Sequence, residues 1–146
     1  FWLEVKERVK RSINGTSRVI VYQDGLPDTQ NELVEKIINE VQSPNYELLR
    51  FLIEKGGKVL GTEDPELLKK EYNFITQIIR AQDEIKKNKL KQAYENQAGE
   101  LLVKRDTYIA SRIDKTLNGG ELGILFIGAA HDIKERFPAN IQIEIL

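Results

Sequence analysis

The stretch GILFIGAAHD, residues 123–132, joins an apolar run, three small residues and the single histidine of the chain. A short unbroken apolar run that ends in glycine and alanine is typical of a buried β-strand followed by a loop. His131 would then lie just beyond the carboxyl end of that strand. Because helical patterns and other strand patterns precede this stretch, it predicts an α/β fold with a polar site at the strand ends.

Four segments have the pattern of strands, and helical patterns separate most of them. The strand patterns are a β-branched run, the short run KVLGT, the run ILFI and a strict alternation of isoleucines, at residues 18–23, 58–62, 123–128 and 141–145. Apolar residues at helical spacing occupy residues 1–13, 31–41, 44–55 and 131–137. This order predicts a parallel or mixed sheet of about four strands with helices on both faces. The final alternation predicts an edge strand.

A long helical hairpin insertion is predicted between the second and third of these strands. Apolar residues keep a helical period from Pro65 onward and again over residues 93–117. The intervening residues 83–92 are mostly charged, so we expect a solvated helix end or a turn near residues 87–89. Asp64, directly before Pro65, fits the N-cap of the first helix.

Composition and charge exclude several classes of protein. The 146 residues include 22 basic and 23 acidic side chains, which gives no general attraction to nucleic acid or to anionic lipid. No apolar run approaches the ~20 residues that cross a bilayer, and no signal peptide is recognisable. We therefore expect one cytoplasmic α/β domain over residues 1–146, with no nucleic-acid or membrane partner. The absence of methionine, together with an apolar pattern already under way at Phe1, predicts that an N-terminal strand or segment is lacking.

The residue types present also limit the chemistry. The chain contains no cysteine, which excludes disulfides, thiolate nucleophiles and cysteine-ligated metal sites. The motifs of phosphate loops, zincins, serine hydrolases and dinucleotide-binding folds are absent. With one histidine available, a metal site would have to consist mostly of carboxylate, amide and water ligands.

Polar residues follow three of the predicted strands. Gln23 and Asp24 follow the first, Glu63 follows the second, and His131 follows the third. Because the carboxyl ends of parallel strands meet at one edge, we expect Asp24, Glu63 and His131 to form a catalytic site, with His131 as general base or metal ligand. Structural explanations remain open: Asp24 fits a turn, helix capping accounts for much of Glu63, and the histidine can serve as a simple hydrogen-bonding group.

Two arginines and a glycine are candidates for binding a small anionic ligand. Arg105 and Arg112 lie seven residues apart on one stripe of the predicted helix, which also holds Ile109. A partly buried arginine on such a stripe requires an anionic partner. Gly128 opens the small-residue loop, where backbone N–H groups at a helix start could hold an anion.

The segments RDTYIASRI and GELGILFIGAAHD resemble the C-terminal part of the TraB/GumN/Tiki-type family, which is related to the ChaN and erythromycin-esterase fold. In that family an arginine-led helix precedes a glycine-rich turn, an apolar strand and a terminal GxxH motif, as residues 105–117 and 128–131 do here. The resemblance covers about the last third of the chain. It implies a parallel sheet with a strand-end site, which in some members is a metal-dependent hydrolase site built from two GxxH motifs and an acidic residue. This chain has one GxxH motif, and Gln23-Asp24 stands where the family has glutamate.

Two functions follow as hypotheses. Metal-assisted hydrolysis with a divalent metal requires His131 and at least one carboxylate to lie at a common site. A non-catalytic ligand-binding or self-association module of the same fold, forming a homo-oligomer, requires uncovered apolar residues on the helices of residues 67–117.

Overall fold

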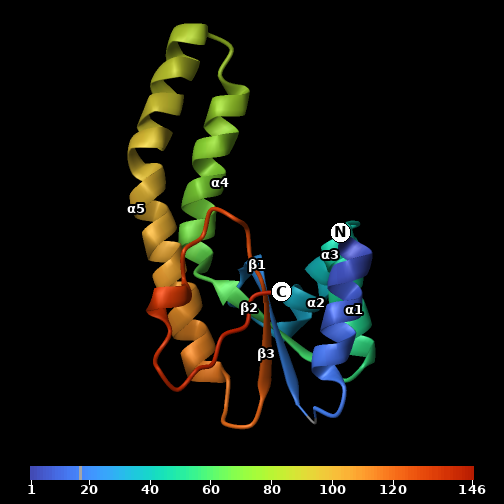
Figure 1. Ribbon diagram of the computed structural model, residues 1–146. Coiled ribbons are helices and arrows are strands. Elements are labelled where there is room, and N and C mark those ends of the chain that lie inside the picture. Colours follow the sequence, from blue (N-terminus) through green and yellow to red (C-terminus); the bar gives the residue numbers. More distant parts are fainter. Residues whose placement is uncertain (17) are drawn as a thin grey trace.

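The computed structural model describes residues 1–16 and 18–146, and in these residues it contains five α-helices and three strands (Figure 1). The strands lie in the order β2-β1-β3 and all of their pairings are parallel. The central strand is β1 (Val19–Pro27), flanked by β2 (Lys58–Glu63) and β3 (Leu122–Phe126). The predicted α/β class is confirmed, and the sheet is purely parallel.

The sheet has three strands rather than about four, because the isoleucine alternation near the C-terminal end forms none. Residues 142–146 have no regular secondary structure. Ile141 packs against the core, whereas Ile143 is 37% and Ile145 78% exposed. Alternating apolar residues make a strand only where backbone groups find a neighbouring strand, and this segment pairs with none of the described strands. One isoleucine anchors the segment and the others remain in solvent.

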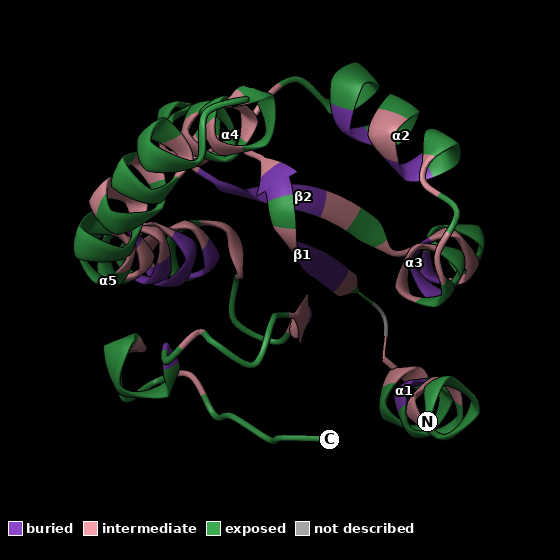
Figure 2. Cartoon of the chain, turned by 90° about the horizontal axis from the view of Figure 1, so that it is seen from above, coloured by how far each residue is buried: buried purple, intermediate pink, exposed green. Residues whose placement is uncertain are grey.

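Helices pack on both faces of the sheet (Figure 2). Val21 and Ile124 belong to a core formed with α1 (Trp2–Ile13), α2 (Asn31–Glu40) and α3 (Pro44–Glu54). Ile20 and Tyr22 belong to the opposite core, formed with the C-terminal half of α5 (Glu84–Thr116). This division follows from the two-residue period of a strand, which sends successive side chains to opposite faces.

The predicted helical hairpin is present and consists of α4 (Pro65–Arg80) and α5. Its turn lies at residues 81–83, earlier than the predicted 87–89, because the Asp83 side chain accepts a hydrogen bond from the Ile85 N–H and so caps α5. The 33 residues of α5 span about 50 Å. Its C-terminal half covers the sheet, and its N-terminal half projects with α4 past the carboxyl ends of the strands (Figure 1).

Two local features shape the carboxyl end of the sheet. The register between β1 and β2 shifts between Gln23 and Pro27, and Gly25 has a φ of +81°, a conformation that favours glycine. After β3, residues 128–131 form a turn in which the His131 N–H donates to the Gly128 carbonyl, and only the short 3₁₀ helix η1 (Lys134–Arg136) follows. The helix predicted over residues 131–137 is therefore mostly absent, and the turn at Gly128 does not lead directly into a helix.

Among the residues that the structure describes, no helix combines the length and the apolar character that crossing a bilayer requires.

Candidate functional site

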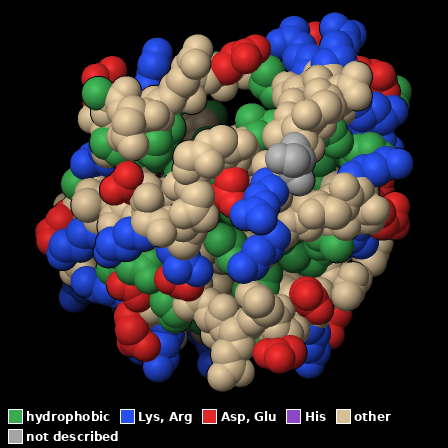
Figure 3. Space-filling model, turned by 90° about the horizontal axis from the view of Figure 1, so that it is seen from below, with side chains coloured by type: hydrophobic (Ala, Val, Ile, Leu, Met, Phe, Trp, Pro, Cys, Tyr) green, Lys and Arg blue, Asp and Glu red, His purple; other side chains and the backbone are tan. Residues whose placement is uncertain are grey.

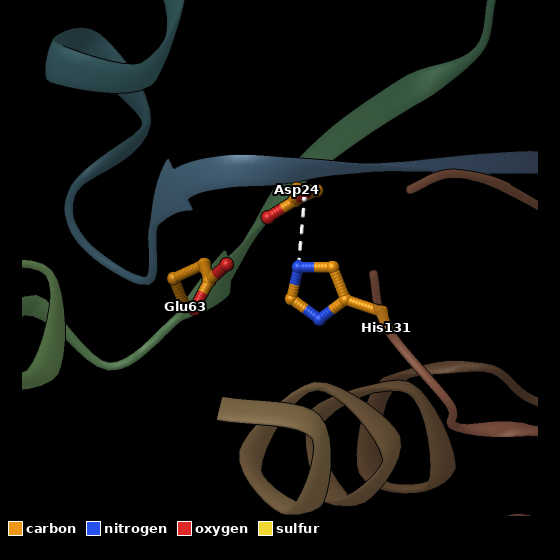
Figure 4. A group of neighbouring side chains, drawn as sticks. All are labelled: Asp24, Glu63 and His131. Atoms are coloured by element: carbon orange, nitrogen blue, oxygen red, sulfur yellow. Dashed lines mark ion pairs between the residues drawn. The ribbon is translucent and has the colours of Figure 1, made fainter. Parts of the chain in front are cut away.

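Three side chains from the ends of three strands converge at one point (Figure 4). Asp24 belongs to β1, Glu63 is the last residue of β2, and His131 lies in the turn after β3. One potential ligand atom from each lies within 4.8 Å of the others. Nε2 of His131 lies 3.2 Å from Oδ2 of Asp24. The structure thus brings together the three residues that the sequence assigned to a strand-end site.

The strand order explains why these strands supply the group. From β1 the chain passes to α2 on one face of the sheet, whereas after β3 it passes to the opposite face, where Ile133 joins the core beside α5. Where the connections of neighbouring parallel strands diverge in this way, a crevice opens at their carboxyl ends, and α/β proteins bind ligands there. Asp24 at the end of β1 and His131 after β3 come from the two neighbouring strands whose connections diverge.

Arg105 of α5 lies among the carboxylates of this group. Its Nε donates to Glu63 Oε2 at 2.9 Å, and its Nη2 donates to Glu63 Oε1 at 2.5 Å and to Asp24 Oδ1 at 2.9 Å. Its Nη1 donates to Glu71 of α4 at 2.8 Å. The side chain is 11% exposed. The anionic partners expected for a partly buried arginine are therefore carboxylates of the chain itself, and the fork of the guanidinium holds them in place.

Asp106 belongs to the site and is absent from the residues predicted for it. It is 2% exposed, its Oδ1 lies 2.5 Å from His131 Nδ1, and its Oδ2 accepts from the Asp132 N–H at 3.1 Å. A carboxylate on Nδ1 fixes the orientation of the imidazole and leaves Nε2 facing Asp24. The sequence contains one signal for it. Asp106 lies three residues before Ile109 and seven before Ile113, so it shares the apolar face of the helix with them, where an acidic residue is unusual.

Negative charge exceeds positive charge in this group. The carboxyl groups of Asp24, Glu63, Glu71 and Asp106 face one guanidinium and one imidazole. Burial raises the pKa of Glu63; Arg105 opposes this rise and the neighbouring Asp24 adds to it. For Asp24, burial is outweighed by hydrogen bonding to Glu63 and by the charge of His131, so its pKa lies below the ordinary value. Of this carboxyl pair, Glu63 is the one that retains a proton more readily.

The other two predicted binding residues have different surroundings. The Gly128 N–H donates to Asp24 Oδ2 at 3.2 Å, and a Cβ at this position would lie 3.2 Å from the same oxygen. Gly128 therefore lets the turn approach the group closely, and its N–H binds a carboxylate of the chain. Arg112 pairs with Asp28 at 2.8 Å and donates to the Gly61 carbonyl at 3.3 Å, so it forms a separate contact beside the group.

The side chains of the group differ in how far they are exposed to solvent. The Glu63 side chain is 0% and the His131 side chain 5% exposed, whereas Asp24 is 19% and Glu71 23% exposed. Asp24 and Glu71 are therefore the carboxylates of the group that solvent reaches most easily.

The amino-terminal end of the sheet has a different character. Figure 3, viewed from that end, shows acidic and basic side chains intermixed and no histidine. A hollow of about 580 Å³ there is lined by residues that include Lys10, Phe51 and Lys55, and no described lining residue is acidic or a histidine. The group of described side chains that could hold a metal ion, Asp24, Glu63 and His131, lies at the carboxyl end.

No protein-family model matches the chain, and no curated protein or solved structure matches it significantly. The resemblance to the TraB/GumN/Tiki-type family therefore stays a prediction, and the function must be inferred from the geometry of the strand-end group.

Proposed function

We propose that Asp24, Glu63 and His131 bind a divalent metal ion and that the chain performs metal-assisted hydrolysis at this point. The observation that carries the proposal is the approach of their three ligand atoms to within 4.8 Å of one another. One imidazole and two carboxylates suit ions such as Mn²⁺, Zn²⁺ and Co²⁺ and leave coordination positions for water and substrate. When bound, such an ion lowers the pKa of a water molecule and polarises a carbonyl or phosphoryl oxygen.

The charge of the group fits a cation. Even with both Glu63 and His131 protonated, the three remaining carboxylates outnumber the two positive side chains around them. Excess charge is costly where side chains are buried, and a divalent ion would remove it. Glu63 Oε1 accepts from Arg105 and from the Gly25 N–H, and Asp24 Oδ2 accepts from the Gly128 N–H and faces His131. Glu63 Oε2 and Asp24 Oδ1 each accept one hydrogen bond, from Arg105, and each keeps a second lone pair.

The remaining residues position this group. Arg105 holds Asp24, Glu63 and Glu71 together, and Asp106 orients His131 through Nδ1. Arg112 has no such role in this proposal, because Asp28 already pairs with it.

The sequence resemblance agrees with this assignment. The GxxH motif ends at His131, and Asp24 is the acidic residue at the end of an earlier strand. The proposed site differs from the two-GxxH arrangement in having carboxylates from two strands beside one histidine. In this proposal Glu63 takes the place of a second histidine ligand.

Thermal unfolding with and without Mn²⁺, Zn²⁺ and Co²⁺ tests the metal site. An ion that binds only the folded chain stabilises it by about 2.7 kcal/mol at a hundredfold excess over the dissociation constant. We expect this rise in the parent and its loss in Asp24→Asn, which keeps the side-chain shape, and in His131→Ala. Asp28→Asn is the matched control, because this carboxylate follows the same strand outside the group and should leave the rise intact.

The affinity for the metal ion tests the positioning role of Asp106. Asp106→Asn should weaken metal binding by roughly 10–100-fold without abolishing it, because the ligands remain and only the orientation of His131 is loosened.

An activity assay tests the proposed hydrolysis. The hydrolysis of ester, amide and phosphoester substrates is compared between the metal-loaded parent and Asp24→Asn. The proposal fails if no ion stabilises the parent, if Asp24→Asn responds as the parent does, or if the metal-loaded parent hydrolyses none of the three classes.

A further inference from the structure

The tip of the helical hairpin, residues 79–92, is basic although the chain as a whole is not. It contains five basic and two acidic residues, whereas the rest of the chain has 17 basic and 21 acidic residues. The basic residues are Arg80, Lys86, Lys87, Lys89 and Lys91. All of them except the half-buried Lys87 are exposed, and the tip projects past the carboxyl ends of the strands (Figure 1). A concentration of positive charge thus extends from the body of the molecule.

The basic residues of the tip have no acidic partner within the described part of the chain. None of the five takes part in an ion pair there. The middle of the same helix is different, because Lys104 pairs with Glu100, four residues earlier, at 2.6 Å. The charge of the tip is therefore available to a partner outside the chain.

The lysines of the tip do not stabilise the helix that carries them. Lys86 and Lys87 lie in the first turn of α5, where the positive end of the helix dipole disfavours a basic side chain. Lys86 also lies three residues before Lys89, a spacing at which like charges repel each other. Lys87 and Lys91, four residues apart, repel each other in the same way. Helix stability therefore does not explain why lysines gather here.

Two isoleucines are exposed among these charges. Ile79 is 74% and Ile85 68% exposed, and they lie on the two sides of the turn at residues 81–83. A partner that matches the tip offers carboxylates to the lysines and apolar side chains to the isoleucines. We propose that the hairpin tip binds an acidic peptide segment of another protein, in which carboxylates are interspersed with apolar residues.

Two other polyanions match the tip less well. Proteins bind single-stranded nucleic acid with aromatic side chains on which the bases stack, and residues 79–92 include no aromatic residue. An anionic bilayer would meet the projecting hairpin at its turn, where Asp83 and Glu84 would face the lipid phosphates. A peptide can instead lie along the side of α5, beside Lys86 and Lys89.

The hairpin tip is distant from the strand-end group. Lys86 precedes Arg105 by 19 residues on the same helix, which corresponds to about 28 Å. A peptide can therefore bind the tip without covering Asp24, Glu63 or His131, and this inference does not depend on the proposed metal site.

Fluorescence anisotropy of a labelled peptide in which glutamates alternate with leucines tests the interaction. The parent should bind this peptide, and added salt should weaken the binding, because exposed charges are screened. The double variant Lys86→Glu/Lys89→Glu should bind it roughly tenfold more weakly or worse, since like charges then face each other. The double variant Lys86→Arg/Lys89→Arg keeps the charge and should bind as the parent does.

The matched control is Lys69→Glu/Lys70→Glu near the base of α4. It changes the net charge by the same amount at two exposed lysines outside the tip, so the peptide should bind it nearly as it binds the parent. Circular dichroism checks that all of the variants fold. The proposal is overturned if the parent does not bind the peptide, or if the control weakens binding as much as Lys86→Glu/Lys89→Glu does.

Other probes define the chemistry of the partner. A peptide with serine in place of leucine should bind the parent several-fold more weakly, and Ile85→Ser should weaken binding of the leucine peptide to a similar extent. Equal binding of the two peptides would overturn the role of the isoleucines. Tighter binding of a single-stranded oligonucleotide, or of vesicles that contain phosphatidylserine, would overturn the choice of an acidic peptide.

Discussion

Charged side chains are buried at the strand ends, whereas apolar side chains are exposed on the hairpin. Both regions depart from the usual distribution, in which charged side chains are exposed and large apolar side chains are buried. They differ in where their partners lie. Every buried polar side-chain atom in the described part of the chain has a hydrogen-bond partner, whereas an apolar stripe on α4 (Tyr72, Ile75 and Ile79) stays exposed among the described residues. Substitutions at the strand ends should therefore change folding stability strongly, and substitutions on the stripe should leave it almost unchanged.

Removal of Arg105 is expected to have the largest effect. Arg105→Ala leaves Asp24, Glu63 and Glu71 without their shared guanidinium, which should lower the free energy of unfolding by about 3–5 kcal/mol. Urea denaturation measures this loss. The matched control is Arg112→Ala on the same helix, where one partly exposed pair with Asp28 is lost, at a cost of about 1 kcal/mol. Equal losses in the two variants would mean that the strand-end group is no more sensitive than a surface pair.

A smaller effect is expected where the hairpin joins the group. The Tyr94 hydroxyl donates to Glu71 at 3.0 Å, so Tyr94→Phe should cost about 1 kcal/mol near neutral pH. Burial, with a further contribution from Glu71, raises the pKa of Tyr94 above its ordinary value of 10.0. The hydrogen bond from Tyr94 should therefore stabilise the folded parent below pH 10, and this stabilisation should be lost as the pH rises through the raised pKa of Tyr94. Denaturation at several pH values checks this; a Tyr94→Phe variant that shows the same alkaline loss as the parent would contradict it.

The smallest effect is expected on the stripe itself. In the monomer, Ile79→Ala should change the free energy of unfolding by less than about 0.5 kcal/mol, because Ile79 is 74% exposed. The contrasting variant is Ile109→Ala on α5, whose fully buried side chain should cost about 2–5 kcal/mol. Both are measured at the lowest chain concentration that gives a signal, so that association does not contribute. A large loss in Ile79→Ala would show that the stripe is already covered within one chain.

Periodicity predicted the parts of the fold that depend on local pattern. The β-branched run at β1, the short run at β2 and the hairpin all follow from residue spacing, and Asp64 caps α4 as expected by accepting from the Glu66 N–H. The prediction of a fourth strand was wrong because a strand needs a neighbouring strand to pair with. The alternation of Ile141, Ile143 and Ile145 does not reveal whether such a neighbour exists. The hairpin turn was misplaced because one cap, Asp83, outweighs a longer run of charged residues.

The candidate site was predictable to the extent that it depends on strand ends. Asp24, Glu63 and His131 each follow a strand, and parallel pairing brings them together. Capping does not account for Glu63, because Asp64 performs it while Glu63 is buried against Arg105. The separate places of Arg105 and Arg112 could not be predicted, since they share one stripe and differ only in which carboxylate of the folded chain each one meets.

The strand order sets the sequence of events by which this chain can assemble. Val19 of β1 pairs with Leu122 of β3, and the whole hairpin lies between them, so this pairing closes one of the longest loops in the chain. Contacts so distant in sequence form slowly. The hairpin joins residues close in sequence and can form early, whereas the meeting of His131 with Asp24 must wait for β3 to reach the sheet. If the strand-end group binds a metal as proposed, that binding would therefore report the completion of folding.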